Sequence, residues 1–171
     1  MCEMSAMKRI LFWPEWDCYF GAGVTAFKTL LDENERYLFV NLSRVSLIPF
    51  INDFRVNKFK ERVVIISSGE LLPLASWLHE VNSNICGVFS SDISVVELLW
   101  QLSNKNRRAS PAIPRSRKIS HRDVLLLRNA LNGGDIYLMQ HFFGCSRATL
   151  YRWRSDVAKK LGCSRLKQLA L

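Results

Sequence analysis

The 171-residue sequence predicts two successive units, a parallel α/β unit followed by an all-helical unit. Short apolar runs alternate with helical patterns in residues 1–103, whereas apolar residues after position 118 recur only at helical spacing. The charge divides in the same way. Residues 1–103 hold 9 Lys and Arg against 12 Asp and Glu, a net charge of −3, while residues 104–171 hold 15 against 3, a net charge of +12. This asymmetry favours a polyanionic partner for the second part alone.

Four apolar runs in the first part have the length of strands: 8–13, 37–42, 62–67 and 85–89. Helical patterns separate or follow them at 21–31, 71–81 and 93–102, and less regularly at 47–54. Strands that are apolar along their whole length are typical of a parallel sheet with helices on both faces. Each strand–helix–strand crossover is then expected to be right-handed.

Residues 104–118 (NKNRRASPAIPRSRK) have the composition of a linker. Two prolines disfavour helix and strand interiors, and like charges keep such a segment extended. We therefore expect a basic, Pro-containing tether, and contact of its basic residues with phosphates is an alternative left open.

Residues 119–171 are expected to form four helices, each beginning at a residue that can cap it. These capping residues are Ser120, Asp135, Ser146 and Ser164. Asp123 lies three residues after Ser120, where it completes a capping box. Glycines at 133, 144 and 162 follow the first three helices, as expected of helix ends.

The third of these helices has one apolar face and one basic face. Its apolar residues fall at i, i+7, i+8 and i+11: Leu150, Val157, Ala158 and Leu161. A short helix, a glycine turn and a helix with Arg, Tyr and Ser near its start form a helix-turn-helix pattern. Guanidinium groups pair with guanine or phosphate, and hydroxyls reach either, so the pattern predicts double-stranded DNA as the partner.

Residues 119–169 resemble, without a gap, the helix-turn-helix domain of the LuxR/FixJ (NarL-like) family of bacterial transcription regulators. The segment 119–123 (ISHRD) matches the opening L-[ST]-x-R-E of that family. Thr149-Leu150 matches the T-V pair at the start of its recognition helix, and 160–163 (KLGC) matches K-L-G-V. The resemblance implies a sequence-specific DNA-binding transcription regulator.

The resemblance also implies which side chains contact DNA. Base reading is implied for Tyr151, Arg152 and Ser155, and phosphate contact for Arg147, Thr149, Arg154 and Lys159. The lysine and histidine usual in the family are replaced by Tyr151 and Trp153, so the target sequence of relatives does not transfer. Trp153 is expected to pack against either the second helix or the DNA backbone.

Residues 1–103 resemble, more faintly, a shortened receiver domain of a response regulator. Glu15 or Asp17 matches the acidic group that holds Mg²⁺ in a receiver, but the phosphoacceptor position falls near Asn41, whose amide is not a nucleophile. The strand expected before Tyr37 is missing. We therefore expect a degenerate receiver-like domain, without a phosphoacceptor, that forms a homodimer or a heterodimer with another LuxR-type regulator.

Several other functions are disfavoured by the sequence. It contains no Ser/His/Asp, Cys/His or paired-carboxylate cluster, so we expect neither an enzyme nor a cofactor, metal or small-molecule ligand. Five cysteines without a CxxC pair disfavour zinc or disulfide chemistry, and Cys145 and Cys163 are expected to be core positions. No apolar run reaches the ~18 residues of a membrane span, so a cytoplasmic protein is expected.

Two alternatives stay open for the basic second part. The chain could modulate a related regulator by heterodimerisation without reading DNA itself. A basic helix on a membrane surface is less favoured, because the apolar face of the third helix is needed for the core of its own unit.

Overall fold

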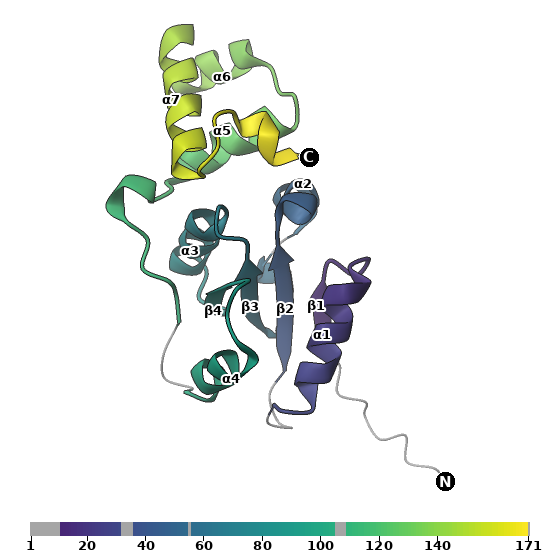
Figure 1. Cartoon of the computed structure of the whole chain (residues 1–171). Coiled ribbons are helices and arrows are strands. Elements are labelled where there is room, and N and C mark those ends of the chain that lie inside the picture. Colours follow the sequence, from purple (N-terminus) through teal and green to yellow (C-terminus); the bar gives the residue numbers. More distant parts are fainter. Residues whose placement is uncertain (1–10, 32–35, 55, 105–108, 171) are drawn as a thin grey trace.

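The structure is a computed structural model of the chain, and it describes residues 11–31, 36–54, 56–104 and 109–170. A sheet flanked by helices forms one half of the molecule, and a cluster of helices forms the other (Figure 1). The predicted fold class, a parallel α/β unit followed by a helical unit, is confirmed.

The sheet contains four parallel strands in the order β1-β2-β3-β4. The strands are β1 (Leu11–Trp13), β2 (Tyr37–Leu42), β3 (Arg62–Ser67) and β4 (Ile85–Ser90). All four lie within or close to the predicted runs, and residues 8–10 of the first run lie outside the described residues. The two central strands are almost wholly buried, as expected of a parallel sheet covered on both faces.

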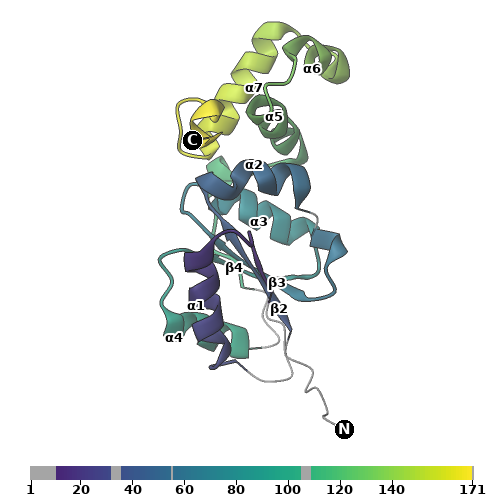
Figure 2. The same cartoon turned by 90° about the vertical axis from the view of Figure 1, so that its right-hand side faces the viewer.

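Two helices cover each face of the sheet (Figure 2). The helices of this unit are α1 (Cys18–Lys28), α2 (Arg44–Asp53), α3 (Leu72–Val81) and α4 (Val95–Ser103), with a 3-10 turn η1 (Val56–Lys58) after α2. Tyr37 and Phe39 of β2 pack with α1 and α4, whereas Leu38 and Val40 pack with α2 and α3. The period-2 alternation along β2 therefore separates two hydrophobic clusters, one on each face.

The crossover through α1 has the opposite hand to the crossovers through α2 and α3. The strand order advances in one direction, yet α1 lies on one face and the two following helices lie on the other. The expectation that every crossover is right-handed is therefore wrong for this sheet.

The helical unit consists of three α-helices and a short final turn. They are α5 (His121–Leu131), α6 (Ile136–Phe143), α7 (Arg147–Lys160) and the 3-10 turn η3 (Leu166–Ala170). A fourth α-helix was expected at η3. The Gln168 side chain instead accepts hydrogen bonds from the Ser164 hydroxyl at 2.9 Å and the Arg165 backbone N–H at 3.2 Å, which holds these residues in a tight turn.

The segment between the two units is held by both of them. The Ala109 carbonyl accepts a hydrogen bond from the Val88 N–H at 2.8 Å, so Ala109 extends the sheet beside β4 by one bridge. After the turn η2 (Arg115–Arg117), Arg117 Nε donates to the Lys160 carbonyl at 2.9 Å, and its Nη2 donates to the Gly69 carbonyl at 3.4 Å. Residues 109–118 are thus mostly exposed but are hydrogen-bonded to both units.

Helix α2 forms the main contact between the two units (Figure 1). The side-chain amides of Asn52 and Asn132 donate to each other at 2.9 and 2.8 Å. Phe50 of α2 and Leu169 of η3 belong to one continuous hydrophobic cluster. Within the part of the chain that the structure describes, no helix combines the length and apolar character needed to cross a bilayer.

Candidate nucleic-acid interface

Local hydrogen bonds fix the start of α7. Gly144 ends α6 in the left-handed region at φ 58°, which L residues rarely adopt, and this reverses the chain. The Ser146 hydroxyl then accepts the Thr149 N–H at 3.2 Å as the N-cap. Asp135 caps α6 in the same way through the Tyr137 N–H at 2.7 Å. Both predicted caps are confirmed.

The buried face of α7 determines which side chains point outward. Leu150, Val157, Ala158 and Leu161 are buried, as their spacing predicted. The exposed residues recur at i, i+4 and i+8 and form one stripe along the opposite face: Arg147, Ala148, Tyr151, Arg152, Ser155, Asp156 and Lys159. We refer to these seven residues as the α7 stripe.

Five of the seven side chains expected to contact DNA lie in the α7 stripe, and two lie at its edge. Thr149 is half-buried, and its hydroxyl lies 2.9 Å from the Ser146 hydroxyl. Arg154 is also half-buried, and its Nη2 donates to the Asn129 side-chain oxygen of α5. The structure therefore places Arg154 between α5 and α7 rather than among the exposed side chains.

Arg147 lies against two tyrosines at the tip of the helical unit. Its guanidinium carbon is 5.7 Å from the ring centre of Tyr137 and 5.6 Å from that of Tyr151, and Nη2 donates to the Tyr151 hydroxyl at 3.3 Å. This hydrogen bond and the neighbouring charge raise the pKa of Arg147 and lower the pKa of Tyr151. The contacts hold Arg147 and Tyr151, two of the side chains expected to contact DNA, against Tyr137 in one arrangement.

Trp153 packs inside the helical unit. Its ring meets Phe143 of α6 edge-on at 5.8 Å, and the Arg122 guanidinium lies 4.4 Å from the ring centre. Of the two positions expected for Trp153, the structure shows packing against the second helix.

A buried ion pair joins the start of α5 to the end of α7. Asp123 Oδ2 accepts hydrogen bonds from Lys160 Nζ at 2.6 Å and from the Ser120 N–H at 2.9 Å, and the Ser120 hydroxyl caps α5. Burial by itself raises the pKa of Asp123, but the hydrogen bonds from Lys160 and Ser120 outweigh it and hold the pKa below its usual range. This pair fixes α7 relative to α5.

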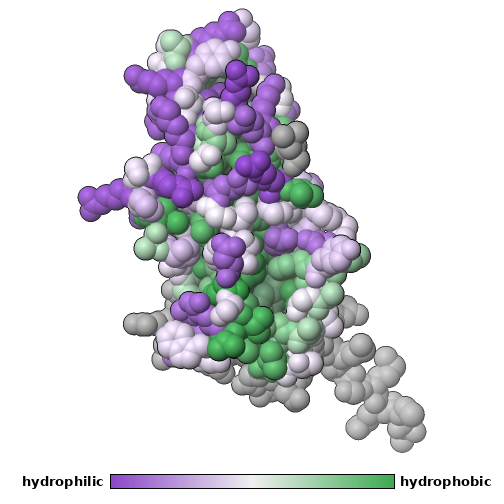
Figure 3. All heavy atoms as spheres, in the orientation of Figure 1, coloured by the Kyte–Doolittle hydropathy of each residue, from purple (hydrophilic) through white to green (hydrophobic). Residues whose placement is uncertain are grey.

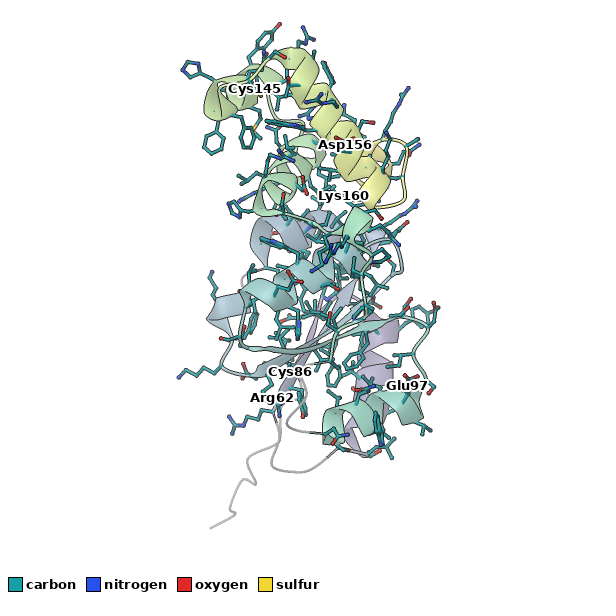
Figure 4. The ribbon with its side chains drawn as sticks, turned by 90° about the vertical axis from the view of Figure 1, so that its left-hand side faces the viewer. Arg62, Cys86, Glu97, Cys145, Asp156 and Lys160 are labelled. Atoms are coloured by element: carbon teal, nitrogen blue, oxygen red, sulfur yellow. The ribbon has the colours of Figure 1, made fainter. Side chains whose placement is uncertain are left out.

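Asp156 is a member of the α7 stripe that sequence reasoning missed. It points outward from α7 one turn before Lys160 (Figure 4). A carboxylate repels phosphate but accepts a hydrogen bond from the amino group of cytosine. Its spacing of i+4 from Arg152 was the available sign that it shares the exposed face.

Cys145 and Cys163 lie at the turns on either side of α7 and pack against the hydrophobic cluster of the unit. Cys163 Sγ donates to the Ala158 carbonyl at 3.4 Å, and burial raises the pKa of its thiol. These contacts support core positions. Among the described residues, no group of three or more His, Cys, Asp or Glu side chains is placed to hold a metal ion.

The position expected for a phosphoacceptor holds a hydrogen-bonded amide. Asn41, near the carboxyl end of β2, donates from Nδ2 to Asp17 Oδ2 at 2.7 Å, while Asp17 Oδ1 caps α1 by accepting the Phe20 N–H at 3.0 Å. The carboxylate that could bind a cation is thus engaged twice within the protein, and the neighbouring amide offers no nucleophile.

Comparison with known proteins places the chain in a family. The model of the EcpR N-terminal domain matches residues 2–105. The chain is 34% identical over 169 residues to the Vi polysaccharide biosynthesis protein TviA of Salmonella typhi, covering 94% of this chain and 93% of that protein.

Solved structures of the response regulator RcsB show a more distant likeness. A structure of the RcsB–DNA complex matches with a TM-score of 0.38 and 14% identity, covering 86% of this chain and 79% of RcsB. A structure of two RcsB dimers bound to two parallel DNAs matches with a TM-score of 0.40 and 15% identity, covering 87% and 80%.

Proposed function

The chain belongs to the family defined by the EcpR N-terminal domain, and from this premise we propose that it is a DNA-binding transcription regulator that works without phosphorylation. It acts as a homodimer, or as the auxiliary partner of another LuxR-type regulator. Its activity is binding rather than catalysis.

The α7 stripe is the observation that carries this proposal. It presents two arginines, a lysine, a tyrosine and a serine on one exposed face, beginning at a capped helix N-terminus whose backbone N–H groups favour phosphate. The first turn of α7 lies at the end of the molecule farthest from the sheet (Figures 1 and 2). The α/β unit therefore leaves this face open to a duplex.

The side chains of the α7 stripe have different roles in recognition, according to their chemistry. Arg152 pairs with guanine in the major groove, and Tyr151 and Ser155 donate to base edges or phosphate. Arg147 and Lys159 contact phosphates and contribute the salt-dependent part of the affinity. Thr149 and Arg154 support this face from its edge, the first at the N-cap and the second through Asn129.

The hydrogen bond between Asn41 and Asp17 supports independence from phosphorylation. Phosphoryl transfer would require a nucleophilic carboxylate at Asn41 and a free acidic group to bind Mg²⁺. In this chain the amide and the carboxylate satisfy each other at 2.7 Å. The occupancy of DNA sites is accordingly set by protein concentration and partner binding.

A selection of binding sites from random duplexes with the purified full chain tests the proposal. We expect one enriched motif, and Arg152→Ala should weaken binding to it by about 1–3 kcal/mol while leaving binding to a scrambled duplex less affected. Arg165→Ala is the matched control, since it removes the same charge from an exposed position outside α7. Equal losses for both variants, or equal affinity for cognate and scrambled duplexes, would contradict base reading by Arg152.

A second function is favoured by the exposed apolar face of α6. Tyr137, Leu138 and Phe142 are each at least 64% exposed, and such a face suits a protein partner. In this alternative the chain modulates a related regulator without reading DNA. Repeating the selection with a LuxR-type regulator present separates the two functions, because a motif enriched only with that regulator and unchanged by Arg152→Ala supports the alternative.

A further inference from the structure

We propose that the outer face of α1 and α4 pairs with the same face of a second copy of this chain. This inference deepens the proposed function by naming its partner, and the pairing itself is independent of whether α7 reads DNA. The face comprises Tyr19, Gly23 and Leu30 of the α1 side and Val95, Val96 and Trp100 of α4, and we call it the α1–α4 face.

The α1–α4 face exposes large apolar side chains that a folded protein normally buries. Tyr19 is 93% exposed, Val96 is 77% exposed and Trp100 is 57% exposed. Hydrophobic side chains gather in the lower half of Figure 3, where α1 and α4 face the viewer, while hydrophilic ones predominate on the helical unit in this view. Contiguous apolar surface of this kind marks an interaction site, and tyrosine and tryptophan are enriched in such sites.

The α1–α4 face contains a groove between the two helices. A groove of about 350 Å³ runs between α1 and the start of α4, and Phe39 and Ile66 of the sheet line it. Gly23 forms part of its wall, and a Cβ atom added there would meet nothing within 4 Å. The groove therefore has room for an aromatic side chain from the opposite surface, and the exposed Tyr19 beside it is such a side chain.

The charge of the α1–α4 face selects a second copy as the partner. α1 carries no charged residue before Lys28, and α4 carries one, Glu97, which is labelled in Figure 4. Two identical faces that carry a single carboxylate each meet with little repulsion, whereas DNA or an anionic membrane would find no basic residue on α4 to bind. Pairing through the helical unit would instead bring together two surfaces of the strongly basic part of the chain.

The position of the face also suits two-fold pairing of a DNA-binding protein. In Figure 2, α1 and α4 lie beside the sheet, away from α6 and the start of α7. A two-fold axis through the face leaves both α7 stripes exposed, so one dimer presents two recognition helices to two half-sites. An interface of ordinary size covers about 800 Å² per partner, which two helices with several exposed aromatic and β-branched residues can supply.

Sedimentation velocity of the full chain without DNA tests the pairing. We expect a dimer at micromolar concentration and at least a roughly 100-fold rise in its dissociation constant for Gly23→Arg. This substitution places a charge in the groove, and the open space at Gly23 and the helical backbone allow the folded unit to accept it. Val81→Arg is the matched control, since Val81 is also an exposed apolar residue but lies on α3, on the opposite face of the sheet.

A second variant and a second readout complete the experiment. Val96→Glu should also give a monomer, and dissociation should shift the total tryptophan emission to the red as the Trp100 ring enters water. A wild-type chain that stays monomeric at about 100 µM, or a dimer unaffected by both variants, would overturn the proposal. Arg152→Ala should remain a dimer. Gly23→Arg should still bind a single half-site but lose cooperative binding to two half-sites. These outcomes distinguish failure of the pairing from failure of DNA reading.

Discussion

The ion pair between Asp123 and Lys160 should be the largest single polar contribution to the stability of the helical unit. Asp123→Asn keeps the size of the side chain and its ability to accept the Ser120 N–H, but removes the charge that Lys160 Nζ meets at 2.6 Å. The Asp123 side chain is 2% exposed and that of Lys160 is 24% exposed, so water replaces the lost partner only in part.

The expected loss follows from these distances and exposures. A hydrogen bond between charged groups contributes about 1.5–3 kcal/mol, and an unpaired, half-buried ammonium adds a desolvation cost. A fully buried pair would cost ~3–5 kcal/mol when broken, and the partial exposure of Lys160 places this pair lower, at about 2–4 kcal/mol. With a urea m value of about 2 kcal/mol/M, the unfolding midpoint should fall by roughly 1–2 M.

Urea unfolding followed by far-UV circular dichroism measures this loss. A double-mutant cycle with Lys160→Met, which keeps most of the apolar stem of that side chain, isolates the pair from the helix cap. We expect a coupling free energy of at least about 1.5 kcal/mol. A coupling below about 0.5 kcal/mol, or additive losses, would refute the assignment of this pair as a stabilising contact.

The same pair predicts a dependence on pH. Because the folded state lowers the pKa of Asp123, its contribution is present above the unfolded value of about 3.9 and is lost as the pH falls through the lower folded value. The free energy of unfolding of the wild type should therefore fall between pH 6 and pH 3, and that of Asp123→Asn should fall less over the same range. A difference in stability between wild type and variant that stays constant over that range would contradict a lowered pKa of Asp123 in the folded state.

Three further outcomes are expected. Asn41→Asp with acetyl phosphate should leave DNA affinity unchanged, since Asp17 and one carboxylate do not rebuild a receiver site; a phosphate-dependent gain measured by fluorescence anisotropy would contradict the proposed independence. Gly162→Ala should destabilise the chain by about 1–2 kcal/mol in thermal unfolding, because φ is +68° at this position. An added Cβ atom meets nothing within 4 Å, so the backbone conformation alone causes the loss. Raising the pH toward 10 should weaken DNA binding, because the pKa of Tyr151 is lowered and its phenolate would lie beside phosphate. In a titration of DNA affinity against pH, Tyr151→Phe should remove this dependence.

The helical unit could be predicted closely because its signals are local. Ser120, Asp135 and Ser146 each accept a backbone N–H within three residues of themselves, so capping patterns in the sequence locate the helix starts. The spacing of Leu150 and Val157 then determines which side of α7 is buried, and hence which side chains are exposed.

Contacts between residues distant in sequence could not be predicted in the same way. Lys160 meets Asp123 across 37 positions, and Arg154 meets Asn129 across 25, so neither partner is visible in a local pattern. The start of α2 was also unclear, because Pro49 interrupts the helical pattern and Ser46, which fixes the start by accepting the Ser43 N–H at 2.9 Å, lies inside the helix. The hand of the α1 crossover depends on the whole sheet, which the order of strands and helices does not reveal.

The anchored segment between the units has a consequence for the geometry of target sites. Because Ala109 pairs beside β4, Arg117 bonds to both units and α2 packs on η3, the distance from the α1–α4 face to the tip of α7 is set by packed contacts. In a dimer, the separation of the two DNA half-sites would then be a fixed property of the fold. Inserting a few residues between α4 and Ala109 should therefore leave the preferred operator spacing the same.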